Sequence, residues 1–258
     1  MMFAEYDPVR IIKHVFGVHP DQIAPTVLIA PARHFVTEFI ERLQKPQPFG
    51  RWFTGVSGFL EDERVVTVLD NIRYAPGMAD CVYFLQFAGV KQILYTGAIG
   101  GLAKGMQIGD LVLAKDCERG DGASGYFASL FERACVCTEL AKKVRPVLES
   151  VADKEGLQLF EGRIFTTDSL AAETIDFLTA LSVQSFVGIE METSALYTVA
   201  ESAGMDAVAA HVVSDLPLQG KSLFDDLTKK EKERRVSAQS AIINALSQSI
   251  VALMKEDE

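Results

Sequence analysis

The chain has 258 residues, of which 48% are hydrophobic and 23% charged, and it carries a formal charge of -10 at pH 7. This length suits one large α/β domain, so we expect a single domain over residues 1–258. The acidic balance excludes a broad basic surface for nucleic acid, and any anionic ligand must be held by a local cluster of cations.

The cysteines and the N-terminal segment indicate the compartment. The four cysteines form no C-x-x-C pair, which is typical of a reducing cytosol rather than of a disulfide framework or a metal site. Residues 1–16 contain acids and an early proline where a secretory signal would be basic and then apolar. No run approaches the ~20 apolar residues of a membrane span. We therefore expect a cytoplasmic protein without metal, membrane or nucleic acid.

The first part of the chain alternates strands with helices. Residues 26–31 (TVLIAP) form a short apolar, β-branched run, and residues 33–43 repeat large apolar side chains at helical spacing. We expect a turn or loop over 45–50, extended strands with glycine breaks over 51–70, and a helix over 76–90.

The same alternation continues to the C-terminus. The expected elements, in order, are a strand over 92–96, a glycine loop over 97–110, a strand over 111–115, a helix over about 132–152, an extended segment over 162–168, a strand over 205–215 and a long helix over 227–255. This alternation predicts a three-layer α/β/α sandwich around a central mixed β-sheet. Ligands in such sheets bind at the carboxyl ends of strands.

Three acids stand where strands end. Asp215 and Ser214 follow a near-continuous apolar strand, so they either lie at a ligand site or cap the next turn. Glu190 and Glu192 flank Met191 where a strand-like run meets a helix. If that junction is extended, both glutamates point the same way. Alternatively, the helix dipole favours two acids at the helix N-terminus.

The glycine loop GAIGG (97–101) is neither a P-loop nor a dinucleotide fingerprint, because no lysine follows it and Ile99 occupies the place of the second glycine. We interpret this loop together with three other motifs of the chain. The motifs are, in order, ILYTGAIGGL (93–102), GDLVLAKDCERGDGASGYF (109–127), GIEMETSALY (188–197) and HVVSD (211–215).

Together these motifs resemble the nucleoside phosphorylase superfamily, which includes purine and uridine phosphorylases and methylthioadenosine nucleosidases. EMETSA resembles the E-M-E-x-A signature of the family, and RGDGAS resembles the R-x-D-G-A-S stretch of uridine phosphorylases. The resemblance spans roughly residues 15–217. It implies a phosphorylase-like fold, a pentosyltransferase activity and a homo-oligomer, either a dimer or a hexamer.

The resemblance also implies roles for the acids. Glu192, the second glutamate of the signature that begins at Glu190, would accept hydrogen bonds from the ribose 2′- and 3′-hydroxyls, and Met191 would pack against the sugar. A carboxylate also stabilises the positive charge that develops on ribose as the glycosidic bond breaks. Asp215, in the Ser-Asp pair, would be the general acid that protonates purine N7.

Arginines are the candidates for binding phosphate, because guanidinium forks match its geometry. Arg33 lies in a P-A-R sequence that resembles the phosphorylases' G-D-P-x-R loop, without its Gly-Asp. Arg51 begins RWFT, which resembles an R-E-F-T motif whose arginine reaches a neighbouring subunit's phosphate. Arg73 is a possible substitute ligand. Inorganic phosphate would be the co-substrate, with no other cofactor.

The chain departs from the family around the glycine loop. Phosphorylases carry an arginine two residues before the first glycine and a Ser or Thr after it, whereas here Tyr95 and Ala98 flank Gly97 at these positions. This keeps a hydrolytic nucleosidase open, although Arg33 and His34 stand where its water-activating glutamate would fall. A non-catalytic nucleoside-binding relative is a third possibility.

The base is the remaining question. RGDGAS favours uridine, whereas Asp215 favours a purine, and Phe165 and Tyr126 are candidates to stack on the base. We predict a purine nucleoside phosphorylase of nucleoside salvage that releases free base and ribose-1-phosphate, with uridine phosphorylase as an alternative.

Overall fold

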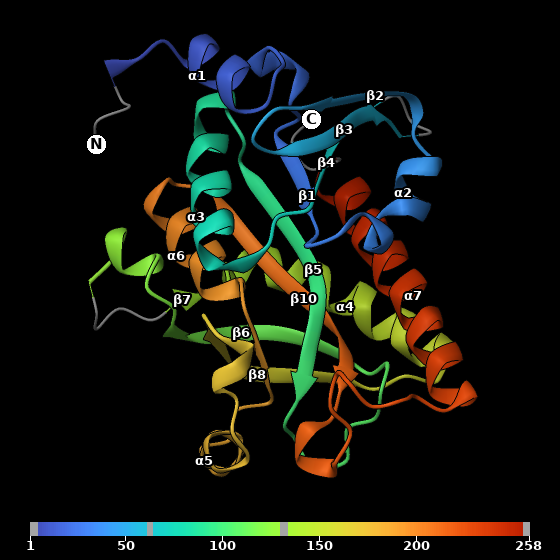
Figure 1. Ribbon diagram of the computed structural model, residues 1–258. Helices are drawn as coiled ribbons and strands as arrows, with labels where there is room; N and C mark the ends of the chain where they lie inside the picture. Colours follow the sequence, from blue (N-terminus) through green and yellow to red (C-terminus); the bar gives the residue numbers. More distant parts are fainter. Residues whose placement is uncertain (1–4, 61–63, 130–133, 255–258) are drawn as a thin grey trace.

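One mixed β-sheet organises the computed structural model, which describes residues 5–60, 64–129 and 134–254 (Figure 1). The ten strands of the described residues are β1 (Thr26–Ile29), β2 (Gln44–Gly50), β3 (Thr54–Phe59), β4 (Val65–Asp70), β5 (Gln92–Gly101), β6 (Leu111–Gly120), β7 (Ala134–Cys135), β8 (Leu159–Thr167), β9 (Gly188–Glu190) and β10 (Asp206–Asp215). Their order is β10–β6–β8–β9–β5–β1–β4–β3–β2, with β7 beside β6. Since β5 also pairs with β10, one half of the sheet closes on itself.

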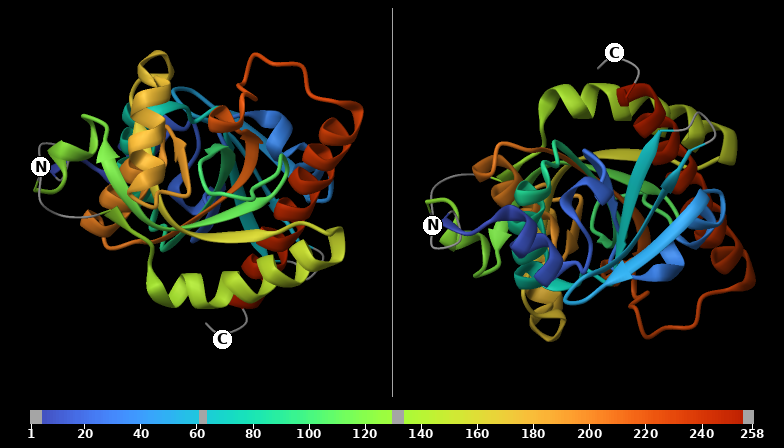
Figure 2. Two further views of the ribbon diagram at one scale, coloured as in Figure 1. Left: turned by 90° about the horizontal axis from the view of Figure 1, so that it is seen from below. Right: turned by 90° about the horizontal axis from the view of Figure 1, so that it is seen from above.

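Helices cover both faces of this sheet. Besides short 3-10 turns, the described helices are α1 (Pro8–Val15), α2 (Thr37–Glu41), α3 (Tyr74–Leu85), α4 (Thr138–Glu155), α5 (Ile175–Val183), α6 (Thr193–Ser202) and α7 (Lys229–Met254). Helices α1, α3 and α6 gather on one face, and α2, α4 and α7 on the other (Figure 1). Figure 2 shows α4 running beside α7.

The alternation of side chains along the strands creates the two larger hydrophobic cores of the described residues. In β1, Val27 and Ile29 belong to the core under α1, α3 and α6, whereas Leu28 belongs to the core under α2, α4 and α7. Successive residues of a strand face opposite sides of the sheet, so a strand buried on both sides must be apolar at every position. The predicted α/β/α layers around a mixed sheet are thereby confirmed.

Two local predictions were wrong. Residues 45–50 were expected to form a loop, but they lie in β2, the last strand at one end of the sheet order. Pro46 and Pro48 are compatible with this edge position, because an edge strand leaves one row of backbone groups without a ladder partner. The helix expected over 33–43 is divided into a 3-10 turn at Arg33–Phe35 and the short helix α2.

Two other boundaries moved. β5 continues to Gly101, so residues 97–101 belong to the strand and not to the expected glycine loop. The helix expected from about residue 132 begins at Thr138 as α4, and Ala134–Cys135 form β7 instead. Residues 130–133, which include the start of that prediction, lie outside the described residues, as does residue 255 of the predicted terminal helix. In the described part of the chain, no helix combines the length and apolar character that a bilayer crossing requires.

The sheet brings distant motifs together. β5 and β10 run parallel, with Asp215 opposite Gly100 in register, so their carboxyl ends meet. β9 pairs with β5 in the antiparallel sense through Ile189 and Gly100, and it places Glu190 beside Thr166 of β8. The segment after β9 therefore lies next to the end of β10.

Candidate functional site

A cavity of about 200 Å³ opens at these carboxyl ends. It combines apolar walls with several acids. Its lining residues are Pro31, Ala98, Ile99, Gly100, Leu170, Glu173, Ile189, Glu190, Met191, Glu192, Ser214, Asp215 and Leu223. An apolar pocket in which a few polar groups converge is the usual form of a small-molecule site.

Glu190 is an internal anchor of this cavity. One carboxylate oxygen accepts from the hydroxyl of Thr166. The other accepts from the backbone N–H groups of Glu192 and Thr193 and from the Thr193 hydroxyl, each at 2.8 Å. Burial raises the pKa of Glu190, and these donors oppose that rise. The expectation that the helix N-terminus favours an acid therefore describes Glu190, which fixes the turn into α6.

Glu192 also lines the cavity, but its carboxylate bonds to a different set of donors. The chain turns at this residue, with φ -133° and ψ -31°, so the two glutamates diverge instead of lying side by side as in an extended segment. Its Oε1 accepts from the backbone N–H of Tyr74 at 2.7 Å, and its Oε2 accepts from the Tyr95 hydroxyl at 3.1 Å. Tyr74 holds a left-handed φ of 62°, an unusual conformation for a non-glycine residue that aims this N–H. Burial and the nearby Glu190 raise the pKa of Glu192 to about 7.

The tyrosine that replaces the family's arginine is thus part of the site. Tyr95 is buried, and burial together with the Glu192 carboxylate raises the pKa of its phenol, which stays neutral and donates. A Cβ at Gly97 would lie 2.9 Å from the Tyr95 hydroxyl, so the glycine leaves room for it. Gly97 itself does not line the cavity, whereas its neighbour Ala98 does.

Asp215 and Ser214 stand at the end of β10. The Ser214 hydroxyl donates to Asp215 at 2.6 Å. The carbonyl oxygen of Ile99 lies 3.3 Å from the same hydroxyl, as an alternative acceptor. Burial raises the pKa of Asp215, although the bond from Ser214 opposes the shift. A carboxyl group with a raised pKa in an apolar cavity is suited to act as a general acid.

Of the three arginines predicted to bind phosphate, two lie near Pro31 and the third lies near Gly17. The Nε of Arg73 donates to the carbonyl of Pro31, a residue of the cavity wall, at 3.1 Å. Arg33 lies two residues beyond Pro31 and pairs through Nε with the buried Asp70 at 2.5 Å. Arg51 lies at the turn between β2 and β3, where its side chain packs near Gly17. None of the three arginines is among the residues that line the cavity.

The two candidates for stacking on the base lie outside the cavity. Tyr126 is 88% exposed in a 3-10 turn after β6. Phe165 packs edge-on against Phe177 and Phe186, and the absence of a side chain at Gly120 makes room for its ring. Met191, by contrast, lines the cavity as its sequence motif predicts.

The RGDGAS motif has a structural role in this chain. Asp121 accepts from the backbone N–H and the hydroxyl of Ser124, at 2.7 and 2.8 Å, and from the hydroxyl of Ser194 in α6. Arg119 donates to the Ser124 hydroxyl at 2.9 Å. The motif therefore fastens the loop after β6 to α6, and it does not reach the cavity.

Sequence reasoning missed Glu173, which lines the cavity from the loop between β8 and α5. Burial and, less strongly, the charge of Asp215 raise its pKa to about 7. The available signal was an acid within a few residues of the carboxyl end of an expected strand. Within the described ranges, no group of three or more His, Cys, Asp or Glu side chains is arranged to hold a metal ion.

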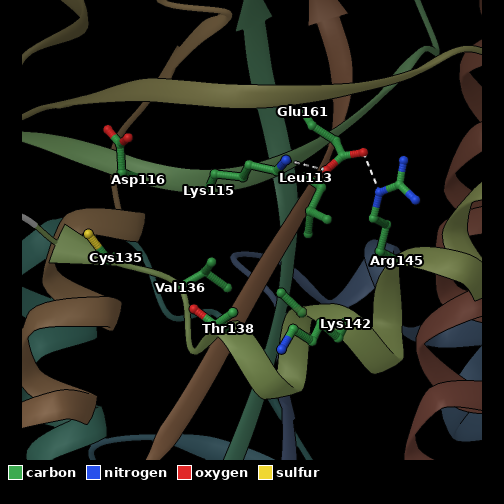
Figure 3. A pocket seen from close by; sticks show the side chains of 10 residues that line it. Leu113, Lys115, Asp116, Cys135, Val136, Thr138, Lys142, Arg145 and Glu161 are labelled. Carbon is green, nitrogen blue, oxygen red and sulfur yellow. Dashed lines mark hydrogen bonds and ion pairs between the residues drawn. The ribbon is translucent and has the colours of Figure 1, made fainter.

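A larger cavity of about 450 Å³ lies between β6, β8 and the start of α4 (Figure 3). Its charges neutralise one another: Glu161 pairs with Lys115 at 2.9 Å and with Arg145 at 2.5 Å. Lys142 pairs with Glu139 at 2.7 Å. None of the residues predicted to form the site lines this cavity, so the smaller cavity is the stronger candidate.

Comparisons with known proteins show which family the chain resembles. The family model described as "Phosphorylase superfamily" matches residues 7–248. A purine nucleoside phosphorylase DeoD-type from Brevibacillus brevis is 26% identical over 217 residues, 81% of this chain and 89% of that protein. The relative of the same name from Bacillus cereus is 26% identical over 150 residues, which span 58% of this chain and 60% of that protein.

Solved structures share the fold. A uridine phosphorylase from Vibrio fischeri, complexed with 6-hydroxy-1-naphthoic acid, superposes with a TM-score of 0.77 at 20% identity, over 92% of this chain and 94% of that one. A purine nucleoside phosphorylase from Toxoplasma gondii, in complex with immucillin-H, has a TM-score of 0.77 at 18% identity, over 93% and 95%.

Proposed function

Because this chain belongs to the phosphorylase superfamily, we propose that it is a nucleoside phosphorylase that cleaves the N-glycosidic bond of a purine nucleoside with inorganic phosphate. The products are the free base and ribose-1-phosphate. The observation that carries the proposal is that Glu192 and Asp215 line one cavity from different elements. One has the chemistry to hold a sugar and the other to protonate a base.

Glu192 binds the ribose. Each of its oxygens already accepts one hydrogen bond, from the Tyr74 N–H or the Tyr95 hydroxyl, and each retains a further lone pair for the 2′- or 3′-hydroxyl. The ligand's hydroxyls thus complete the solvation of a buried carboxylate. Met191 packs against the sugar. As C1′ becomes positive, the nearby carboxylate stabilises the oxocarbenium-like transition state.

Asp215 completes the reaction at the base. Its proton moves to N7 while the electrons of the C1′–N9 bond move to N9, so the purine leaves as a neutral molecule. A phosphate oxygen then forms the new bond to C1′. Ser214 orients Asp215 by donating to one of its oxygens. Inorganic phosphate is the only co-substrate in this scheme.

Phosphate binding is assigned to arginines near Pro31. Arg73 is exposed and its Nε contacts only a carbonyl among the described residues, whereas Arg33 is engaged with Asp70. Replacing Arg73 by alanine is expected to raise the KM for phosphate roughly 10-fold or more, with a smaller change in the KM for nucleoside. Steady-state kinetics with varied phosphate test this. An unchanged phosphate KM in Arg73→Ala, beside a raised one in Arg33→Ala, would transfer the role to Arg33.

Arg51 fits the proposal only in an assembly. Because it lies away from the cavity of its own chain, it would serve the cavity of a neighbouring subunit in a homo-oligomer, a dimer or a hexamer. With its acidic charge balance and its cysteines outside any C-x-x-C pair, the chain suits a cytoplasmic enzyme of purine salvage.

The test is release of base from inosine, guanosine, adenosine, uridine and methylthioadenosine, with and without phosphate. We expect strict dependence on phosphate and production of ribose-1-phosphate. Tyr95 and Ala98 at positions where phosphorylases carry phosphate ligands favour a second candidate, a hydrolytic nucleosidase. Release of free sugar without phosphate would support that candidate. Nucleoside binding without release of base from any substrate would indicate a non-catalytic relative.

A further inference from the structure

His211 is a buried histidine that the proposed mechanism does not use. It lies on β10, four residues before Asp215, and it is fully buried. Its Nε2 lies 3.1 Å from the hydroxyl oxygen of Thr193. Among the described residues, no group is hydrogen-bonded to its other ring nitrogen, Nδ1. A buried polar atom without a partner costs stability, so the other contacts of this histidine must compensate.

The hydroxyl of Thr193 decides which nitrogen of His211 carries the hydrogen. Oε2 of Glu190 accepts from two backbone N–H groups and from the Thr193 hydroxyl, each at 2.8 Å. Since backbone N–H groups only donate, this oxygen is an acceptor, and the single proton of the Thr193 hydroxyl points to it. The Thr193 oxygen can then only accept from His211. The hydrogen of the imidazole therefore lies on Nε2, and Nδ1 carries a lone pair.

The ring of His211 is neutral. An imidazolium would carry a second hydrogen on Nδ1, and no acceptor among the described residues is bonded there. Burial disfavours the charged form as well and lowers the pKa of His211 to about 3. His211 is therefore a constant hydrogen-bond donor to Thr193.

A second chain of donors reaches Glu190 in the same way. The hydroxyl of Thr166 donates to Oε1 of Glu190, and Sγ of Cys117 lies 2.9 Å from the Thr166 oxygen. Because the proton of Thr166 points to Glu190, the buried thiol of Cys117 is the donor to Thr166. Each hydroxyl that bonds to Glu190 is thus supported by a buried donor behind it, Cys117 in one chain and His211 in the other.

His211 also contacts a direct support of Glu192. Tyr95 donates to Oε2 of Glu192, and its ring meets the ring of His211 edge-on, with centroids 5.6 Å apart and an interplanar angle of 77°. His211 lies opposite Gly97 in the pairing of β10 with β5. A Cβ at Gly97 would lie 2.9 Å from the Tyr95 hydroxyl, so the glycine leaves the room that Tyr95 occupies.

We propose, on the basis of the function proposed above, that His211 is a positioning residue for the ribose-binding carboxylate of Glu192. It acts from two directions. Its Nε2 donates to Thr193, which bonds the same Glu190 oxygen as the backbone N–H of Glu192. Its ring packs against Tyr95, whose hydroxyl bonds the Glu192 carboxylate. A carboxylate that must meet two ribose hydroxyls binds them less well when its orientation is not fixed.

The experiment compares kcat/KM for inosine and for 2′,3′-dideoxyinosine, which lacks both hydroxyls, in the wild type, His211→Leu and His211→Gln. Leucine is apolar and cannot donate. We expect His211→Leu to lower kcat/KM for inosine roughly 10-fold and to leave 2′,3′-dideoxyinosine within about threefold. Glutamine can offer an amide N–H in place of Nε2–H, so His211→Gln is expected to restore the ratio of the two substrates to within about threefold of the wild type.

Two results of this comparison overturn the inference. An equal loss on both substrates in His211→Leu would show that the histidine only stabilises the fold. A ratio in His211→Gln that is no closer to the wild type than in His211→Leu would show that the donor is not needed. The matched control is Thr198→Val, which removes another buried hydroxyl of α6, one without a hydrogen-bond partner among the described residues. We expect the control to keep the wild-type ratio.

The tautomer of His211 is testable without any substrate. In nitrogen NMR of the labelled protein, the imidazole signals that disappear in His211→Gln are expected to show hydrogen on Nε2 and a bare Nδ1, unchanged between about pH 5 and 8. Hydrogen on Nδ1, or a titration in this range, overturns the inference.

Calorimetry separates the inference from the proposed function. If neither nucleoside is cleaved, the proposed function fails, and binding then decides the inference. Weaker binding of inosine but not of 2′,3′-dideoxyinosine in His211→Leu supports it. Binding that is unchanged, or weakened equally for both nucleosides, overturns it.

Discussion

Replacement of Asp215 by asparagine is expected to lower kcat for inosine by roughly 10²- to 10⁴-fold, with a small effect on KM. Asparagine preserves the shape of the side chain and its bond from Ser214, but it has no acidic proton to give to N7. The loss therefore falls on the departure of the base and not on binding. Single-turnover release of hypoxanthine, compared with equilibrium binding of the nucleoside, measures the two effects separately.

A substrate that needs no proton distinguishes acid catalysis from loss of structure. In 7-methylguanosine the base already carries a positive charge at the imidazole ring, so its departure does not require an acid. Asp215→Asn is expected to retain activity toward 7-methylguanosine within about 10-fold of the wild type. An equal loss on inosine and 7-methylguanosine would contradict the role of general acid. Ser214→Ala is the matched control and is expected to reduce activity on inosine only modestly, since it leaves the proton in place.

Replacement of Glu192 by glutamine is expected to lower kcat/KM by roughly 10²- to 10³-fold. The amide fills the same space, but it removes the negative charge beside the developing oxocarbenium ion and replaces one acceptor oxygen with a donor. The bonds from Tyr74 and Tyr95 hold the carboxylate in place in the wild type. Tyr95→Phe removes one of these bonds and is expected to cost less, about 10-fold, because the charge remains.

The substrate hydroxyls give this prediction a specific readout. The wild type is expected to lose activity on 2′- and 3′-deoxyinosine, whereas Glu192→Gln is expected to discriminate little between these substrates and inosine. Equal discrimination in the variant and in the wild type would place the ribose elsewhere in the cavity.

Glu192 also makes the protein sensitive to pH. Its pKa in the folded chain, about 7, lies above the ordinary value of 4.5, so the folded state binds the proton more tightly than the unfolded state. This contribution to stability is present at low pH and is lost as pH rises through about 7. Thermal unfolding between pH 5 and 8 is expected to show a decline in stability that is smaller in Glu192→Gln. A decline that is the same in both proteins would assign the titration to another buried acid.

Two strands that position the site, β1 and β10, were predicted from the sequence and confirmed, whereas β5 extends into the segment expected to be a glycine loop. β1 and β10 are apolar at nearly every position because both faces of each strand are buried, and this leaves a continuous signal in the chain. The carboxyl end of β10 then located Asp215, and the E-M-E motif located Glu192. β2 was missed because its exposed side chains and prolines carry the signal of a loop.

What each acid faces was decided only by the tertiary structure. Glu190 and Glu192 differ by two positions in the sequence and both line the cavity, yet Glu190 is bonded to Thr166 and Thr193 whereas Glu192 is bonded to Tyr74 and Tyr95. The difference depends on a backbone turn and on donors from α3 and β5, which are distant in the chain.

The sequence by itself thus determined the layered fold and the family's acids, since periodicity and short motifs are local properties. Three relations required the folded chain: Glu173 and Asp215 line one cavity, Tyr95 donates to Glu192, and Arg51 does not line the cavity of its own chain. These are relations between segments that only the sheet brings together, and side-chain charge states follow from burial, which no short stretch of sequence specifies.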